Sequence, residues 1–304
     1  MIQNKDLFGN PVIEDVILRD KYIEPPFSVL DTKTGNWQGR KNAWIAKGIK
    51  SEVGRDAKAI HGHEWLSDKN IDNVNDGGGV SIFDPVLCEI AYSWFCPTDG
   101  KILDPFAGGS VRGIVANQLG YKYTGIDLRP EQAESNRDQA INILPVDNQP
   151  QYYCGDSDEI LSRETLQQYD MVFSCPPYLD LEKYSDDPND LSNMSHDKFM
   201  VKYESIIKKS IQQLKGNRFA AWVVGDVRNK KGFFHGLIDK TKQYFIDNGA
   251  NLYNDVIILN SIGSARIRAR GQFDGNRKVV TVHQRMLIFF KGNPNEIKNL
   301  KFNI

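Results

Sequence analysis

Apolar strands and helix-period segments alternate along the chain beyond residue 80, and this alternation constrains the fold more than any other feature. Strands are predicted at 102–104, 121–127, 152–156, 171–174, 219–224, 256–259 and 286–290. Helices are predicted between them at 111–119, 130–143, 198–214 and 234–248. Because parallel strands are joined by right-handed helical crossovers, this order is typical of a doubly wound sheet. The sequence therefore predicts an α/β fold with a mostly parallel, seven-stranded sheet.

Residues 1–79 lack this pattern and are predicted to form an accessory N-terminal segment and linker. Residues 61–79 are polar and rich in Asn, Asp and Gly, as is typical of a surface loop. We therefore expect a domain boundary here and one α/β domain over residues 80–304.

Charge and cysteine content restrict the class of protein. The chain has 38 basic and 39 acidic residues, so any surface for a polyanion must be local. Its cysteines lack the spacing of a zinc ribbon or a C-x-x-C redox motif, and no apolar N-terminal run indicates a secretion signal. They are Cys88, Cys96, Cys154 and Cys175. The longest apolar runs are too short to span a membrane. We expect a reduced, cytoplasmic protein with no structural metal and no membrane partner.

A glycine-rich turn follows the first strand of the domain, where residues 104–110 read Asp-Pro-Phe-Ala-Gly-Gly-Ser. Glycines let the backbone approach a ligand closely, although a tight turn alone explains them too. Asp127 ends the second strand 18 residues after Gly109, where a carboxylate can accept hydrogen bonds from both ribose hydroxyls. Asp156 ends the third strand, at a position suited to an adenine amino group. The three strand ends together predict a cofactor that contains adenosine.

A second motif, Ser174-Cys175-Pro176-Pro177-Tyr178, follows the fourth strand. Proline has no N–H, so the two prolines stiffen the turn and leave carbonyl oxygens free to accept hydrogen bonds. The tyrosine offers a stacking face. This combination indicates a site that holds a planar base by its amino group.

In this order, the two motifs resemble those of the amino-group DNA methyltransferases, which modify adenine N6 or cytosine N4. The resemblance covers about residues 81–292, and a weaker one links residues 25–55 to phage-encoded DNA methylases. It implies a Rossmann-like methyltransferase sheet, S-adenosylmethionine as cofactor, and methyl transfer to a base flipped out of duplex DNA. The chain departs from the family at two positions. At Cys175 the family usually has Asp, Asn or Ser, and Ser110 stands at the third small-residue position of the glycine-rich loop, in place of the residue that is usual there.

The resemblance assigns roles to individual residues. The implied cofactor-binding residues, with the two strand-end acids, are Phe83, Asp84, Pro85, Asp104, Phe106, Ala107, Gly108, Gly109, Ser110, Asp127 and Asp156. The implied catalytic residues are Ser174, Cys175, Pro176, Pro177 and Tyr178. Since a thiol accepts hydrogen bonds poorly, either Ser174 or the Pro176 carbonyl would then hold the amine.

Contacts to DNA are expected from two basic stretches. Residues 261–292 carry many cations against the single acid Asp274, and Gly263 and Gly271 favour a mobile, phosphate-contacting loop. The N-terminal stretch 37–44 combines tryptophans with cations, and Arg40 is its expected base-reading residue. The predicted DNA-binding residues are Arg40, Lys41, Arg266, Arg268, Arg270, Arg277 and Lys278. Asp226, after the fifth strand, is a further candidate at the rim of the site.

Several alternatives remain open on the sequence alone. Cys175 as a covalent nucleophile would point to methylation of a pyrimidine carbon, although the order here is Cys-Pro rather than Pro-Cys. Methylation of RNA would use a similar loop. A nicotinamide-dependent oxidoreductase would need G-x-G-x-x-G, a spacing that Gly108, Gly109 and Gly113 do not give. A catalytically silent DNA-binding protein is a further alternative. The sequence also leaves open whether the protein forms a homodimer, whether its target base is adenine or cytosine, and whether it has a partner restriction enzyme.

Overall fold

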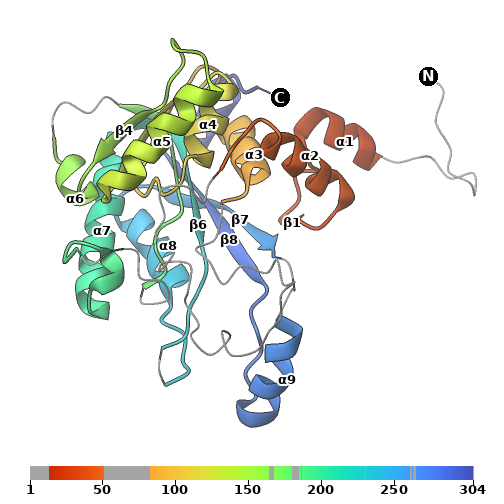
Figure 1. The fold of residues 1–304 in the computed structure, drawn as a ribbon, viewed down its shortest axis with the longest axis vertical. Helices are drawn as coiled ribbons and strands as arrows, with labels where there is room; N and C mark the ends of the chain where they lie inside the picture. Colours follow the sequence, from red (N-terminus) through yellow and green to blue (C-terminus); the bar gives the residue numbers. More distant parts are fainter. Residues whose placement is uncertain are drawn as a thin grey trace, which may run out of the picture.

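An eight-stranded, mostly parallel sheet forms the centre of the computed structural model (Figure 1). The structure describes residues 14–50, 83–163, 168–179, 185, 187–229, 231–260, 262 and 265–303. The strands are β1 (Val29–Asp31), β2 (Lys101–Asp104), β3 (Lys122–Asp127), β4 (Gln151–Cys154), β5 (Tyr169–Ser174), β6 (Leu214–Val224), β7 (Asn251–Leu259) and β8 (His283–Lys291). Their order across the sheet is β1-β7-β8-β6-β5-β2-β3-β4. β8 runs antiparallel to β6 and β7, and the other pairs are parallel.

The predicted α/β fold with a mostly parallel sheet is confirmed, and all seven predicted strands are present as β2 to β8. The sheet has one strand more than predicted, because β1 pairs with β7 at the edge. β1 comes from the N-terminal segment, which the sequence had assigned to an accessory layer. Its three residues are too few for an alternating pattern to be recognised.

The strand order contains a switch point between β2 and β5. From β2 the chain proceeds outward through β3 to β4, and it then crosses to β5 on the other side of β2. Ligands of open α/β sheets bind beyond the carboxyl ends of the strands at such a point. The glycine-rich turn after β2 and the proline-rich turn after β5 therefore begin on either side of it.

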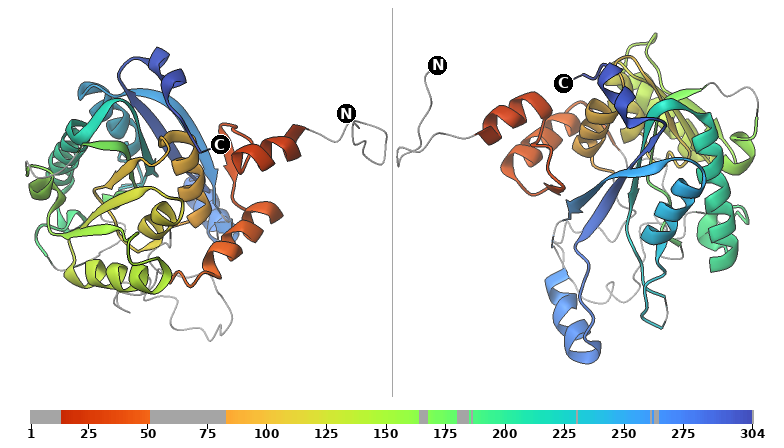
Figure 2. Two further views of the ribbon diagram at one scale, coloured as in Figure 1. Left: turned by 90° about the horizontal axis from the view of Figure 1, so that it is seen from above. Right: turned by 180° about the vertical axis from the view of Figure 1, so that it is seen from behind.

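Helices cover both faces of the sheet. One face packs against α3 (Pro85–Phe95), α4 (Val111–Gln118) and α5 (Pro130–Ile143), and the other against α6 (Ser157–Ile160), α7 (His196–Gln213) and α8 (Leu237–Asp247). Neighbouring strand residues alternate between these cores, as Ile102 and Leu103 do. The remaining helices are α1 (Glu14–Tyr22), α2 (Gly35–Ile45), α9 (Ala265–Asn276) and the 3₁₀ helices η3 (Leu191–Asn193) and η4 (Pro294–Asn299). The two N-terminal helices lie beside α3 (Figure 2).

The stretch predicted to be a mobile basic loop is instead helical over α9. Alanine and arginine favour helix strongly enough to offset Gly271, and Phe273 lies with Ala265 and Ala269 along the wall of a shallow hollow. α9 projects beyond the carboxyl edge of the sheet (Figure 1). Among the helices of the described residues, none has both the length and the apolar character needed to cross a membrane.

Candidate active site

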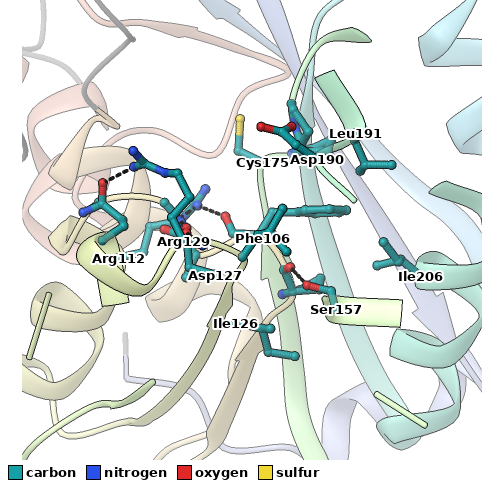
Figure 3. A pocket seen from close by; sticks show the side chains of 18 of the residues that line it. Phe106, Arg112, Ile126, Asp127, Arg129, Ser157, Cys175, Asp190, Leu191 and Ile206 are labelled. Atoms are coloured by element: carbon teal, nitrogen blue, oxygen red, sulfur yellow. Dashed lines mark hydrogen bonds between the residues drawn. The ribbon is translucent and has the colours of Figure 1, made fainter. Parts of the chain in front are cut away.

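A cavity opens at the carboxyl ends of β2, β3 and β5, where the strand order switches (Figure 3). It brings the glycine-rich turn and the proline-rich turn together. Its walls include, among the predicted residues, Phe83, Phe106, Ala107, Gly108, Gly109, Asp127, Asp156, Cys175, Pro176, Pro177 and Tyr178. The two motifs, about 70 residues apart in the sequence, thus line a single site.

The glycine-rich turn is held open by its own backbone contacts. Gly108 has a φ of +52°, a conformation that glycine adopts without strain. Its N–H donates to Asp127 Oδ2 at 2.9 Å, and its carbonyl accepts from Asn136 Nδ2 at 2.7 Å. The turn is therefore fixed on both sides before any ligand binds.

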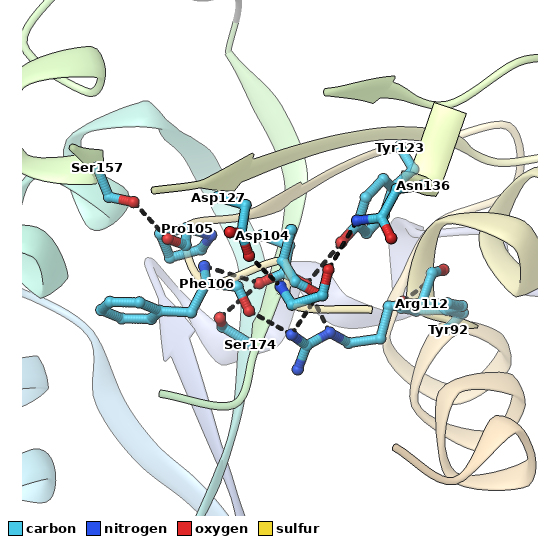
Figure 4. Close-up of polar contacts among 12 residues, drawn as sticks. Tyr92, Asp104, Pro105, Phe106, Arg112, Tyr123, Asp127, Asn136, Ser157 and Ser174 are labelled. Carbon is cyan, nitrogen blue, oxygen red and sulfur yellow. Dashed lines mark hydrogen bonds and ion pairs between the residues drawn. The ribbon is translucent and has the colours of Figure 1, made fainter. Parts of the chain in front are cut away.

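Asp104 supports this turn from beneath and does not line the cavity (Figure 4). Its fully buried carboxylate accepts hydrogen bonds from the Phe106 N–H at 3.0 Å, the Ser174 hydroxyl at 2.6 Å and the Tyr123 hydroxyl at 2.7 Å. It also forms an ion pair with Arg112 Nε at 2.7 Å. Asp104 thereby connects the ends of β2 and β5 and sets the spacing between the two turns.

Arg112 places a buried cation in the cavity wall, and sequence reasoning missed it. Its Nη2 donates to the carbonyls of Phe106 and Ala107, and its guanidinium lies 4.8 Å from the centre of the Phe83 ring. Asp104 neutralises much of its charge, and the attraction raises the Arg112 pKa above its usual value although burial opposes it. The sequence signal that could have identified Arg112 is its position in the first helical turn after the glycine motif.

Asp127 presents its carboxylate to the cavity from the end of β3. Oδ1 accepts from the Arg129 N–H at 3.0 Å and Oδ2 from the Gly108 N–H. Burial raises the pKa of Asp127 to about 6, and these two N–H groups oppose the increase only in part. Each carboxylate oxygen has two lone pairs, so both retain capacity to accept a hydrogen bond from a ligand.

Asp156 also lines the cavity, but its carboxylate already has protein partners. Oδ1 accepts from the Asp158 N–H at 2.9 Å and caps α6, while Oδ2 pairs with Lys202 Nζ at 2.5 Å. Lys202 comes from α7 and lines the same cavity. The acid after β4 is therefore paired with Lys202, and the sequence pattern at the strand end did not indicate this ion pair.

In the proline-rich turn, Cys175 and Tyr178 lie close together, with the Cys175 sulfur 3.5 Å from the Tyr178 hydroxyl oxygen. Ser174, by contrast, is fully buried, and its hydroxyl donates to Asp104. Its side chain is thus directed beneath the turn and does not line the cavity. This geometry leaves the Pro176 carbonyl as the better candidate of the two proposed acceptors.

Five predicted residues do not bring their side chains into the cavity. They are Asp84, Pro85, Asp104, Ser110 and Ser174. Asp84 instead caps α3 and accepts a hydrogen bond from the Trp37 indole at 3.2 Å. Ser110 is buried, and its hydroxyl donates to Gln139 at 3.1 Å. These residues shape the site by holding its supporting elements.

Other cavity residues were not singled out by the sequence because they lie outside the two motifs. They are Arg129, Gln132, Ser157, Asn189, Asp190, Leu191, Lys202, Ile206 and Gln284. Only their closeness to the strand ends in three dimensions identifies them. Asp226, expected at the rim, instead accepts hydrogen bonds from the N–H groups of Val227, Gly236 and Leu237 and so fixes the start of α8.

The predicted DNA-binding residues lie in two places. On α2, Arg40 pairs with Glu89 through hydrogen bonds of 2.6 and 2.5 Å, and Lys41 lies 3.2 Å from Asp84. The others belong to α9 or follow it, namely Arg266, Arg268, Arg270, Arg277 and Lys278. The side chain of Arg268 lies outside the described residues. Arg285 and Lys291 of the same basic stretch point inward, to Asp255 and to two backbone carbonyls.

Histidine, cysteine, aspartate and glutamate do not gather in threes at any described position that would suit a metal ion. His61, His63 and Glu64, which are residue types that can bind a metal and are close together in the sequence, lie outside the described residues.

No protein-family model and no curated protein matches the sequence. Solved structures resemble it at low identity. A putative RNA methyltransferase from Pyrococcus horikoshii is 14% identical, with 84% of this chain and 100% of that chain covered and a TM-score of 0.47. TrmN from Thermus thermophilus is 11% identical, with 69% and 49% covered and a TM-score of 0.45, so this chain spans about half of its length. Magnesium protoporphyrin IX methyltransferase from Synechocystis, with bound S-adenosylmethionine, is 13% identical, with 68% and 79% covered and a TM-score of 0.42.

Proposed function

We propose that this protein transfers a methyl group from S-adenosylmethionine to the exocyclic amino nitrogen of a base in DNA. The observation that carries the proposal is the cavity that Pro176, Tyr178, the glycine-rich turn and Asp127 line together. A donor site and a base site need to share one cavity for direct transfer, and separate sites would not permit it.

The cavity residues suit S-adenosylmethionine. A ribose offers two hydroxyl donors, and Asp127 retains acceptor capacity on both oxygens beside the positive-φ Gly108. Phe106, Ile126 and Leu128 supply apolar wall for the adenine ring. When bound, the cofactor would supply an electrophilic methyl group and leave as the neutral thioether, and the methylated amine would release one N–H proton to water.

The chain's own residues supply positioning and electrostatics. An exocyclic amine is a poor nucleophile because its lone pair is delocalised into the ring. The Pro176 carbonyl accepts one amine N–H, which concentrates the lone pair on nitrogen, and Pro177 keeps that carbonyl fixed. Tyr178 stacks on the base and sets its plane. Asp104 and Arg112 hold the two turns at a constant separation.

DNA is favoured over RNA by the motif resemblance, while the cations that α9 carries at the edge where the cavity opens suit a nucleic-acid backbone of either kind. A base within a duplex has no path to the cavity unless it leaves the stack, so the substrate is a flipped base. Adenine N6 and cytosine N4 present the same amine to the Pro176 carbonyl, and either fits this chemistry.

The test is label transfer from tritiated S-adenosylmethionine to duplex DNA and to RNA, followed by mass analysis of the nucleosides. We expect N6-methyladenine or N4-methylcytosine in DNA. Tyr178→Ala should lower the rate of transfer by at least about tenfold, since base stacking contributes about 1–3 kcal/mol. Tyr178→Phe is the matched control: it retains the ring and removes the hydroxyl that contacts Cys175.

Three results would contradict the proposal. Label found on RNA alone would move the substrate to RNA. Label on a pyrimidine carbon would make Cys175 a nucleophile. Failure of the protein to bind S-adenosylmethionine, while it binds NAD, would remove methyl transfer altogether.

A further inference from the structure

Residues 226–229 and 231–236 form a short hairpin shortly after β6, and the sequence motifs did not include it. Arg228 and Phe234 form an isolated antiparallel bridge. The Asn229 N–H donates to the Phe233 carbonyl at 2.8 Å, and Gly232, with a φ of +90°, completes the turn. Asp226 accepts three backbone N–H groups at its base. The hairpin is therefore firmly attached to the sheet although its turn projects outward.

This hairpin lies against Lys278, two residues after the end of α9. A Cβ atom on Gly232 would lie only 2.5 Å from Lys278 Nζ, so the lysine covers the turn. Figure 1 shows both elements projecting at the same edge of the sheet. We call the described residues of 226–236 and 265–278 together the basic rim.

The basic rim is strongly positive although the whole chain carries a net charge of -1. Its described side chains include six cations, Arg228, Lys231, Arg266, Arg270, Arg277 and Lys278. Its acids are Asp226, which is occupied by backbone N–H groups, and Asp274, which lies 3.7 Å from Arg270. A local concentration of positive charge on a neutral protein fits a polyanionic partner.

Exposed aromatic rings are interleaved with these cations. Phe233 is 70% exposed beside the turn. The Arg228 guanidinium lies 3.8 Å from the centre of the Phe234 ring, and Arg277 lies 5.2 Å from that of Phe273. Aromatic faces and arginine planes stack on bases and sugars, whereas an acidic peptide offers no such partner. The composition therefore favours a nucleic acid over an acidic protein.

The basic rim begins at the cavity that would hold the base. A Cβ atom on Gly225, next to the hairpin, would lie 4.0 Å from Tyr178 Cζ and 3.7 Å from Gln284 Cγ, and both of those residues line the cavity. Four further residues, each advancing about 3.3 Å in extended chain, bring the hairpin to its turn roughly 13 Å beyond Tyr178. Along the axis of a duplex, at about 3.4 Å per nucleotide of one strand, that distance corresponds to about four nucleotides.

We propose that the basic rim binds the backbone of duplex DNA beside the base held in the cavity, with Phe233 packing on an adjoining base or sugar. The inference deepens the proposed function and rests on it, because that function identifies the cavity as a base site. It makes the hairpin, rather than the N-terminal stretch around Arg40, the contact nearest to the reacting base.

The test measures fluorescence anisotropy of a labelled mixed-sequence DNA duplex without cofactor, over a series of salt concentrations. Lys231→Gln and Arg270→Gln each remove one phosphate contact, so each should weaken binding and reduce the slope of log Kd against log salt by about 1. Phe233→Ala should weaken binding about tenfold with the slope unchanged, because its contact is apolar. The matched controls are Lys122→Gln at the start of β3 and Phe27→Ala before β1. Both lie at the amino ends of their strands, away from the carboxyl ends where the cavity opens, and should bind DNA as the wild type does.

Equal thermal midpoints for all five variants and the wild type establish that the folds are comparable. The proposal is overturned if the rim variants bind DNA as the controls do, or if they weaken binding of an RNA of equal length and leave DNA binding unchanged. Because binding is measured without methyl transfer, loss of label transfer alone would count against the proposed function and not against the basic rim.

Discussion

Asp104 and Asp127 both end strands beside the glycine-rich turn, yet their surroundings give them different roles. Asp104 is fully buried and saturated by Arg112 and three hydrogen-bond donors, so it holds the turn in place. Asp127 faces the cavity with two backbone donors and spare acceptor capacity. The sequence placed both in the cofactor site, but only the structure separates the supporting acid from the one that faces a ligand.

We expect the raised pKa of Asp127 to make binding of the proposed cofactor dependent on pH. With a pKa of about 6, the carboxylate is charged above that value and protonated below it. Protonation removes acceptor capacity from one oxygen, so we expect the Kd for S-adenosylmethionine to rise as the pH falls from 7 to 5. Isothermal titration calorimetry across this range checks the prediction.

Asp127→Asn is the control for this pH dependence. It should bind the cofactor about 10- to 100-fold more weakly at pH 7.5, since hydrogen bonds to charged groups contribute about 1.5–3 kcal/mol. Its Kd should also be nearly constant between pH 5 and 7. A variant that keeps the wild-type pH profile would show that another group titrates.

At the scale of elements, Gly113 shows how tightly α4 packs on the strands. A Cβ atom there would lie 2.2 Å from the Tyr152 hydroxyl oxygen and 3.1 Å from Tyr123 Cδ1. The glycine therefore serves close helix-to-sheet packing and not a dinucleotide fingerprint. Among the described residues, the buried Tyr152 hydroxyl has no hydrogen-bond partner.

This contact predicts a rescue between two substitutions. Gly113→Ala should lower the free energy of unfolding by about 1–3 kcal/mol because it overpacks the interface. Tyr152→Phe alone should be neutral or stabilising, since it removes an unpaired buried hydroxyl. In the double variant the loss should shrink by at least half. Urea unfolding of the four proteins gives the coupling, and strictly additive effects would contradict the packing argument.

Elements with a strong local signal could be predicted, and those that depend on distant contacts could not. The helix at 130–143 begins with Pro130 at its first turn, and the prediction is confirmed as α5. β1 has only three residues and exists because it pairs with β7, more than 220 residues away. Similarly, Lys202 enters the cavity because α7 packs beside α6, which no local pattern in the sequence expresses. The two motif turns were predictable because the carboxyl ends of parallel strands share one edge.

Across the whole molecule, the N-terminal segment is joined to the sheet domain by both backbone and side chains. β1 extends the sheet beside β7, while α2 packs on α3. Glu89 of α3, 5% exposed, accepts hydrogen bonds from Arg40 Nε and Nη2 and from Trp44 Nε1 at 2.8 Å. The two tryptophans of α2 that are buried, Trp37 and Trp44, belong to the same core as α3. The segment thus contributes to the stability of the site's supporting face.

Glu89→Gln tests this connection, because it keeps the size of the side chain and removes its charge. Arg40 would lose its ionic partner. The Glu89 side chain is buried but that of Arg40 is 42% exposed, so solvent screens the pair and we expect the free energy of unfolding to fall by about 1–2 kcal/mol. Trypsin should then cleave faster after Arg40 and Lys41, as α2 separates from α3 more often. Glu131→Gln is the matched control: its exposed pair with Arg129, at 3.6 Å, should contribute less than about 1 kcal/mol. If Glu89→Gln unfolds at the same urea concentration as this control and resists trypsin equally, the ion pair does not hold the N-terminal helices to the sheet, and the tryptophans and β1 alone must do so.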